Sequence, residues 1–86
     1  MAKSLEMNHL NFEGPANYRI VVRGFLDERL SDRLAGMRIT SQRRGDTKPL
    51  TSLVGGLRDQ AQLSGVLNAL YEMHLPILSV EVVNGD

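Results

Sequence analysis

The most constraining feature of the sequence is the stretch over residues 55–83, GGLRDQAQLSGVLNALYEMHLPILSVEVV. Asp59 can cap the free amides at the start of a helix, and Gln62 stands three residues later, where the second residue of a capping box belongs. Pro76 cannot continue a helix, so the helix must end before it. The residues after Pro76 alternate between apolar and polar, which is the period of a strand. The stretch therefore predicts a capped helix followed by a strand.

One face of this helix is apolar, because its apolar residues recur at steps of three and four positions. The residues on that face are Leu63, Val66, Leu67, Leu70 and either Met73 or His74. In the strand that follows, the apolar positions are Leu78, Val80 and Val82. The helix and the strand each have one apolar face that can be buried. This half of the chain is therefore expected to form a loop, a helix and a strand.

Apolar and polar positions alternate over residues 18–25, and this alternation predicts a first strand. Asp27 can cap a short helix that runs to residue 35. Gly36 is placed to end that helix in a left-handed turn. The inward residues of this helix are Leu30 and Leu34. Two helical turns form few hydrogen bonds, so this helix needs support from the rest of the domain.

Two further strands precede the second helix. Residues 37–44 predict the second strand, and residues 50–57 predict the third, with Pro49 at its start, where a missing amide does least harm. Gly45 and Asp46 suit the hairpin turn between them.

The expected order is β, α, β, β, α, β, which with right-handed crossovers gives an α+β domain with a ferredoxin-like fold. We expect a four-stranded antiparallel sheet with strand order 4-1-3-2 and both helices on one face. Residues 18–86 would form this single domain. Residues 1–17 are polar with no sustained period, so we expect a mobile N-terminal tail.

The composition argues against several classes of function, namely binding of metals, cofactors, nucleic acid or membranes. The 86 residues include no cysteine, and the two histidines, His9 and His74, are far apart in the sequence, so we expect no metal site and no cofactor. Ten basic and ten acidic residues cancel, which gives no general attraction to nucleic acid or to an anionic membrane. There is no apolar run of membrane-spanning or signal-peptide length. These features predict a soluble, cytoplasmic protein.

Several segments of the chain resemble a known family. They are YRIVVRG at residues 18–24, GDT at 45–47, LVGGLRDQAQLSGVL at 53–67 and LPILSV at 75–80. Together they resemble a family of small bacterial proteins of uncharacterised function. The Asp-Gln-Ala element is the most distinctive part, and many such proteins have a histidine where this chain has Ser64. The resemblance implies a recurrent bacterial module and brings no activity with it.

No group of residues has the spacing of a reaction centre. Residues 55–56 precede helix amides that could accept an anion, but Asp59 stands where the anion would bind, so a structural turn and cap is the better interpretation. His74 suits the end of the apolar face or the carboxyl end of the helix. The acidic residues of the first helix, which have no fixed basic or nucleophilic partner, are Asp27, Glu28 and Asp32. We therefore predict no catalytic residue and no enzyme.

Basic residues suggest two contact surfaces. The candidate anion contacts at the hairpin tip are Arg43, Arg44 and Lys48. The basic residues expected on the sheet face that no helix covers are Arg19, Arg23 and Arg38. RNA binders with this topology carry aromatic side chains on the central strands of that face, and here only Phe25 is available, so nucleic acid is a disfavoured partner.

The back of the second helix is the least ordinary surface. The residues of this candidate partner interface are Ala61, Ser64, Gly65, Asn68 and Ala69. Glu72 is the only charge nearby, and Gly65 costs about 1 kcal/mol relative to alanine inside a helix. A second chain packed closely on this face would account for the glycine. Alternatively, the glycine is simply tolerated there, or the N-terminal tail covers the face.

Two function classes follow. The first is an interaction module with a regulatory or scaffolding role, which binds a protein partner or a second copy of itself through the second helix or an edge strand. The alternative is a small-molecule sensor that holds its ligand between protomers near the turns at Gly24 and residues 55–56. This alternative comes from the analogy of fold alone.

Overall fold

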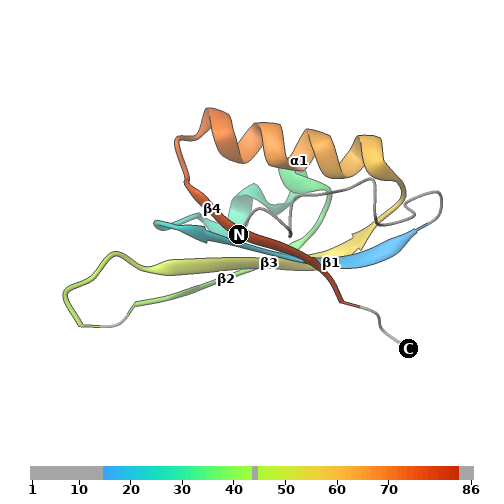
Figure 1. Ribbon diagram of the computed structural model, residues 1–86. Helices are drawn as coiled ribbons and strands as arrows, with labels where there is room; N and C mark the ends of the chain where they lie inside the picture. Colours follow the sequence, from blue (N-terminus) through green and yellow to red (C-terminus); the bar gives the residue numbers. More distant parts are fainter. Residues whose placement is uncertain (1–14, 44, 84–86) are drawn as a thin grey trace.

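A computed structural model of the chain describes residues 15–43 and 45–83. Four strands and two helices form two layers (Figure 1). The elements in chain order are β1 (Ala16–Arg23), the 3₁₀ helix η3 (Glu28–Leu34), β2 (Arg38–Gln42), β3 (Leu50–Leu57), α1 (Gln60–Glu72) and β4 (Ile77–Val82).

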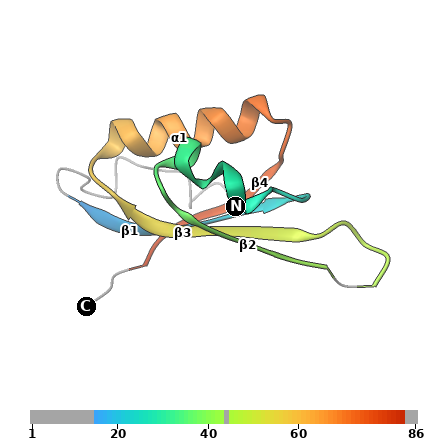
Figure 2. The same cartoon turned by 180° about the vertical axis from the view of Figure 1, so that it is seen from behind.

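The sheet is antiparallel at every pairing and has the order β2-β3-β1-β4. Read from the opposite edge this is 4-1-3-2, so the α+β class and the strand order agree with the sequence prediction. Both helices lie on one face of the sheet, and within residues 15–43 and 45–83 no helix covers the other face (Figures 1 and 2). The central strands are β1 and β3, and the edges are β2 and β4.

The first strand starts earlier than expected. Ala16 pairs with Leu57, and Asn17 pairs with Gly56, so β1 gains two residues before the predicted start at residue 18. The N-terminal part of the predicted mobile tail, residues 1–14, lies outside the described residues. Of the predicted tail, residues 1–17, Ala16 and Asn17 thus belong to β1, and the mobility of the remainder stays a prediction.

The first helix is a 3₁₀ helix and not the expected α-helix. Its predicted cap is confirmed, because the Asp27 carboxylate accepts a hydrogen bond of 2.9 Å from the Arg29 amide. At the other end both Ala35 and Gly36 have positive φ, 61° and 72°, so the expected left-handed turn starts one residue early. Short helical pieces readily adopt the tighter 3₁₀ geometry.

The predicted start of α1 is confirmed. Asp59 accepts a hydrogen bond of 2.9 Å from the Gln62 amide, as an N-cap residue does. The Gln62 side chain accepts a hydrogen bond of 2.8 Å from the amide of Arg58, one residue before the capping residue. The capping box is therefore present in a form shifted by one residue.

The apolar face of α1 covers the sheet as predicted. Leu63, Val66 and Leu70 are buried, and Leu67 packs against them. Of the two candidates for the last position, Met73 packs against the core, whereas His74 is exposed and has φ of 62°. The side chain that completes the face is thus methionine.

The orientation of Leu78 was predicted wrongly. The pairing of β1 with β4 shifts between Val21 and Val22, so that Val21 lies opposite Ser79 and Val22 lies opposite Ile77. This β-bulge leaves Leu78 38% exposed and places Ile77 against the core. A bulge inserts one unpaired residue and reverses the alternation on its far side.

The connection between β2 and β3 is longer than a tight hairpin. Gln42 pairs with Leu50, so the second strand ends at Gln42 and not at the predicted residue 44. Gly45 has φ of 57°, as a turn residue in this connection. Arg44 lies outside the described residues.

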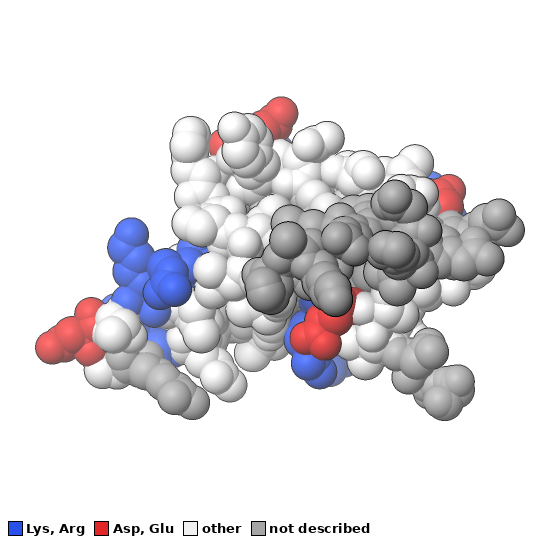
Figure 3. Space-filling view, viewed as in Figure 1, with Lys and Arg blue, Asp and Glu red and all other residues white. Residues whose placement is uncertain are grey.

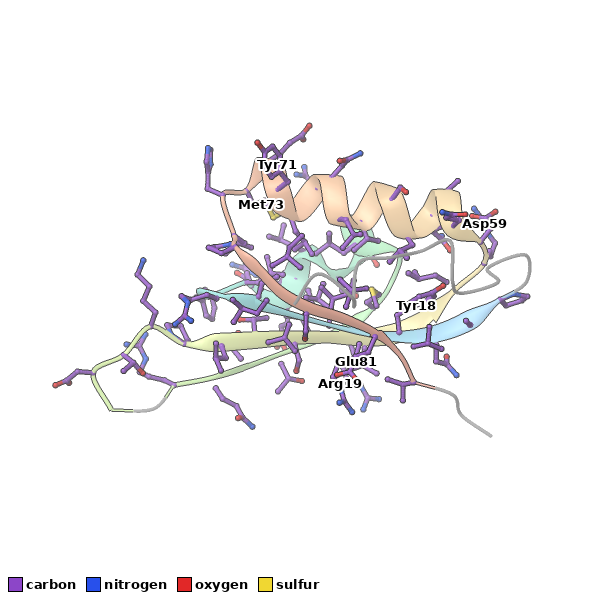
Figure 4. All side chains as sticks on the ribbon, in the orientation of Figure 1. Tyr18, Arg19, Asp59, Tyr71, Met73 and Glu81 are labelled. Carbon is purple, nitrogen blue, oxygen red and sulfur yellow. The ribbon has the colours of Figure 1, made fainter. Side chains whose placement is uncertain are left out.

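The core lies between the sheet and the helices. Its buried residues are Tyr18, Ile20, Val22, Leu26, Leu34, Met37, Ile39, Leu53, Leu57, Leu63, Val66, Leu70 and Val80. Figure 4 shows Tyr18 between the sheet and α1. Burial raises the pKa of the Tyr18 hydroxyl above its usual value.

Candidate functional site

The outer face of α1 is exposed and nearly uncharged. Ala61, Ser64, Gly65 and Asn68 are all exposed, and a Cβ atom built on Gly65 would have no neighbour within 4 Å. Ala69, which the sequence placed at the flank of this face, is half-buried and packs against the core. We define the outer face of α1 as Ala61, Ser64, Gly65, Asn68 and Tyr71.

Tyr71 is the residue of this face that sequence reasoning missed. It is 77% exposed and lies three residues after Asn68 and seven after Ser64, on the same side of the helix. Figure 4 shows Tyr71 on the side of α1 away from the sheet. It also lines a hollow of about 550 Å³ at the end of α1, together with Glu72, His74, Leu75 and Pro76. The helical period alone would have identified it.

Two hollows lie at the end of the sheet from which the β2–β3 connection projects. The first, of about 400 Å³, is lined by Arg23, Gln42, Thr47, Lys48, Leu50 and Leu78. The second, of about 380 Å³, is lined by Arg23, Gly24, Phe25, Lys48, Pro49, His74, Leu75 and Pro76. Figure 3 shows Lys and Arg side chains gathered at this end of the molecule. We call Arg23 and Lys48, which line both hollows, the basic pair.

Only part of the predicted anion contact takes part in these hollows. Lys48 lines both, but Arg43 lines neither and is exposed, and Arg44 lies outside the described residues. Sequence reasoning named Arg23 as a basic residue of the open sheet face, and its position opposite the exposed Leu50 agrees with that placement. It did not connect Arg23 with Lys48, because it treated the sheet face and the hairpin tip as separate surfaces.

Backbone hydrogen bonds join three segments at this end of the sheet. The amide of Arg23 donates to the carbonyl of Pro76 at 3.0 Å, and the amide of Gly24 donates to the carbonyl of Pro49 at 2.7 Å. Gly24 has φ of 118°, and a Cβ there would lie 2.9 Å from a methyl carbon of Leu75. The backbone angle favours glycine at this position, and a Cβ would in addition require the Leu75 side chain to shift.

The open sheet face carries charged side chains together with exposed apolar ones, such as Leu50 and Val54. Arg19 and Glu81 form an ion pair of 3.5 Å across β1 and β4, on the side opposite the helices (Figure 4). Phe25 is 65% exposed, but it follows the end of β1 and does not stand on a central strand. The stacking platform typical of RNA-binding sheets is therefore not formed by Phe25.

Of the three acidic residues for which the sequence predicted no fixed basic partner, Asp27, the capping residue of η3, does have one. The Arg29 side chain donates hydrogen bonds of 2.9–3.3 Å to the Asp27 carboxylate. These bonds, together with the Arg29 amide, hold the pKa of Asp27 below its usual value and raise the pKa of Arg29. Within residues 15–43 and 45–83, no group of three His, Asp or Glu side chains has the geometry of a metal site.

The glycines proposed to flank a ligand are separated within the chain. Residues 55–56 lie inside β3 and not in a turn, and Gly55 pairs with Tyr18 near the start of β1. Gly24 follows the other end of β1. The strand predicted over residues 50–57 is therefore confirmed, and the overlapping prediction of a turn at residues 55–56 is wrong.

These features define a small α+β domain with an open antiparallel sheet, a nearly uncharged outer helix face and a basic pair beside two hollows. The chain belongs to the family described as a domain of unknown function, DUF8691, whose model matches residues 17–81. No curated protein and no solved structure matches the chain. Among the described residues, neither helix is long and apolar enough to cross a membrane.

Proposed function

We propose that this domain is a non-enzymatic protein-interaction module that associates with a second copy of itself through the outer face of α1. The role of such a module would be regulatory or scaffolding. The observation that carries the proposal is the exposure of Gly65 and Tyr71 on one face of a helix whose single charged residue is Glu72.

Three physical arguments support this use of the face. A solvent-facing helix usually carries charged side chains, which α1 lacks except at its last residue. Gly65 allows a neighbouring backbone to approach, because its Cβ position is open space. Exposed tyrosine is enriched at interfaces, where it supplies a large apolar area with a polar end.

The position of Gly65 suits a two-fold pairing of α1 with its copy. Gly65 lies next to the midpoint of the helix, so an antiparallel crossing would bring the two glycines together where the helices are closest. Tyr71 of each copy would then lie toward the end of the partner helix that carries Ala61. The contact is isologous, as in most homodimers.

The test is sedimentation of the wild type and of Gly65→Glu over a concentration series, with a melting curve for each. The monomer should stay folded and gain up to about 1 kcal/mol, since glutamate favours helix more than glycine does. The dimer should dissociate, because an unpaired charge buried at the contact costs several kcal/mol.

Thr40→Glu is the matched control, since it adds the same charge to an exposed residue of β2. A wild type that stays monomeric at high concentration refutes self-association. An oligomer that survives Gly65→Glu but dissociates with Thr40→Glu moves the contact to the sheet or its β2 edge.

The second candidate function is a small-molecule sensor with a ligand held near Gly24. It is favoured by the hollow that Gly24 lines with the basic pair and Phe25. A thermal-shift screen against metabolite classes tests it, because a ligand at 100 times its dissociation constant adds about 2.7 kcal/mol of stability.

We also propose the finer assignments that accompany this function. The βαββαβ order of elements and the strand order support a ferredoxin-like classification. The Gly-x-Thr, Asp-Gln-Ala and Leu-Pro-Ile-Leu-Ser-Val segments support membership of a bacterial group. A chain of this size without cysteine suits a reducing compartment such as the cytoplasm.

A further inference from the structure

We propose that the basic pair, Arg23 and Lys48, binds the phosphate group of a small organic phosphate. The organic group then lies in the hollow of about 400 Å³ that the basic pair shares with Leu50 and Leu78. This site is separate from the outer face of α1 and does not rest on the proposed self-association. The organic group lies outside the hollow that Gly24 lines, so the site does not rest on the second candidate function either.

Charge is the first argument. Both cations line both hollows, and no aspartate or glutamate is among the described residues that line either one. The described ion pairs of the domain join Arg19 to Glu81 and Arg29 to Asp27, so neither member of the basic pair is neutralised within the described chain. Two unneutralised cations match the charge of a phosphomonoester, which approaches −2 at neutral pH.

The remaining lining residues suit the two parts of such a ligand. Gln42 and Thr47 supply an amide and a hydroxyl beside the basic pair. Leu50 and Leu78 are 42% and 38% exposed, and they provide an apolar wall in the same hollow. Leu78 reaches this hollow only because the β4 bulge turns it away from the core. Bulges often re-aim side chains beside binding sites.

The backbone that carries the basic pair is held in place. The Gly24 amide is bonded to Pro49, and the Gly24 carbonyl accepts a hydrogen bond of 2.6 Å from Thr51. The first bond connects the residue after Arg23 to the residue after Lys48, and the second connects it to Thr51, two residues further along β3. The entropic cost of ordering the site on binding is smaller when its supporting segments are already ordered.

A phosphate suits the basic pair better than a carboxylate does. The planar guanidinium of Arg23 can donate two parallel hydrogen bonds to phosphate oxygens, and the Lys48 ammonium supplies a compact second charge. A carboxylate carries one charge and two oxygens, so it leaves one cation without a counter-charge. Preference for a phosphomonoester over the matching carboxylate is therefore the signature of the site.

The experiment is isothermal titration calorimetry of the full chain with phenyl phosphate, benzoate and inorganic phosphate at low ionic strength. We expect phenyl phosphate to bind with a dissociation constant of about 1 mM or tighter, ahead of both other probes. Arg23→Gln and Lys48→Gln should each weaken it roughly tenfold. Arg43→Gln removes the same charge outside both hollows and should leave binding unchanged.

A second pair of variants locates the organic group. Leu78→Ser should weaken the binding of phenyl phosphate and leave the binding of inorganic phosphate unaffected. Phe25→Ser, in the other hollow, should change the binding of neither probe. Melting curves verify that each variant is folded. Absence of binding by phenyl phosphate, equal binding of benzoate, or an equal loss in Arg43→Gln overturns the proposal. A loss with Phe25→Ser and none with Leu78→Ser overturns the assignment to the Leu50 and Leu78 hollow.

Discussion

The hydroxyl of Thr51 donates a hydrogen bond of 2.6 Å to the carbonyl oxygen of Gly24, 27 positions away in the sequence. Thr51 is fully buried, and its one proton is used in this bond. The 2.7 Å contact between Thr51 and Ser41 must therefore be donated by the Ser41 hydroxyl. The Thr51 side chain, which belongs to β3, is thus hydrogen-bonded both to β2 and to Gly24, the residue that follows Arg23 of the basic pair.

Replacement of Thr51 by valine should destabilise the domain by about 1–3 kcal/mol, because the Gly24 carbonyl loses its buried donor while the shape of the side chain is kept. Thr40→Val, at an exposed position of β2, should stay within about 0.5 kcal/mol of the wild type. Urea denaturation of the three proteins measures both effects. Equal stability of Thr51→Val and Thr40→Val would show that the buried bond contributes nothing.

Gly55→Ala should destabilise the domain by about 1–3 kcal/mol through overpacking. A Cβ at Gly55 would lie 3.2 Å from the Cα of Met37, and a backbone atom cannot move aside as a flexible side chain can. The measurement is thermal and chemical denaturation at low protein concentration.

Gly65→Ala is the matched control for Gly55→Ala, because a Cβ at Gly65 meets nothing within 4 Å. This variant should gain up to about 1 kcal/mol from helix propensity. Effects of the same sign at both glycines would contradict the packing described for Gly55.

Asp59→Ala should lower the free energy of unfolding by about 1 kcal/mol through loss of the helix cap. The Gln62 amide would lose its acceptor at the start of α1. Asp32→Ala, on the exposed surface of η3, serves as the control. Chemical denaturation of wild type and both variants measures the change. Unchanged stability of Asp59→Ala would contradict the assigned start of the helix.

Asp27→Asn should remove a pH-dependent part of the stability. The Arg29 hydrogen bonds lower the pKa of folded Asp27, so the carboxylate stabilises the folded state at pH values above the ordinary aspartate pKa. That contribution should be lost as the pH falls through the lowered pKa. The free energies of unfolding of wild type and Asp27→Asn should therefore differ by a constant amount near neutral pH and become equal as the pH falls through the lowered pKa. Denaturation curves at a series of pH values measure both free energies. A difference that persists at acidic pH would contradict the role of this carboxylate.

Local chemistry made several elements predictable. The cap at Asp59, the apolar face of α1 and the stop before Pro76 depend on residues within a few positions of one another, and the structure has all three. The third strand was predicted with its true bounds, Leu50–Leu57, and the order of elements was sufficient for the strand order. Of the residues in the two proposed sites, the small residues of α1, Lys48 and Arg23 were named from the sequence, and their roles stay predictions.

What sequence reasoning missed depends on pairing between distant segments. The bulge opposite Val21 and Val22 exchanged the roles of Ile77 and Leu78, which a regular alternation along β4 cannot foresee. Residues 55–56 were predicted both as the end of the third strand and as a turn, and only the pairing with β1 decides for the strand.

The sequence by itself determined which residues could begin and end each helix or strand and which could face the core. These properties depend on neighbours one helical turn or one strand pleat away. Only the tertiary structure decided that Arg23 and Lys48 line the same hollow as Leu78. This arrangement depends on the register of three strand pairings and on the hydrogen bonds that Gly24 forms with Pro49 and Thr51. Register is set by contacts between segments far apart in the chain, and no local pattern encodes them.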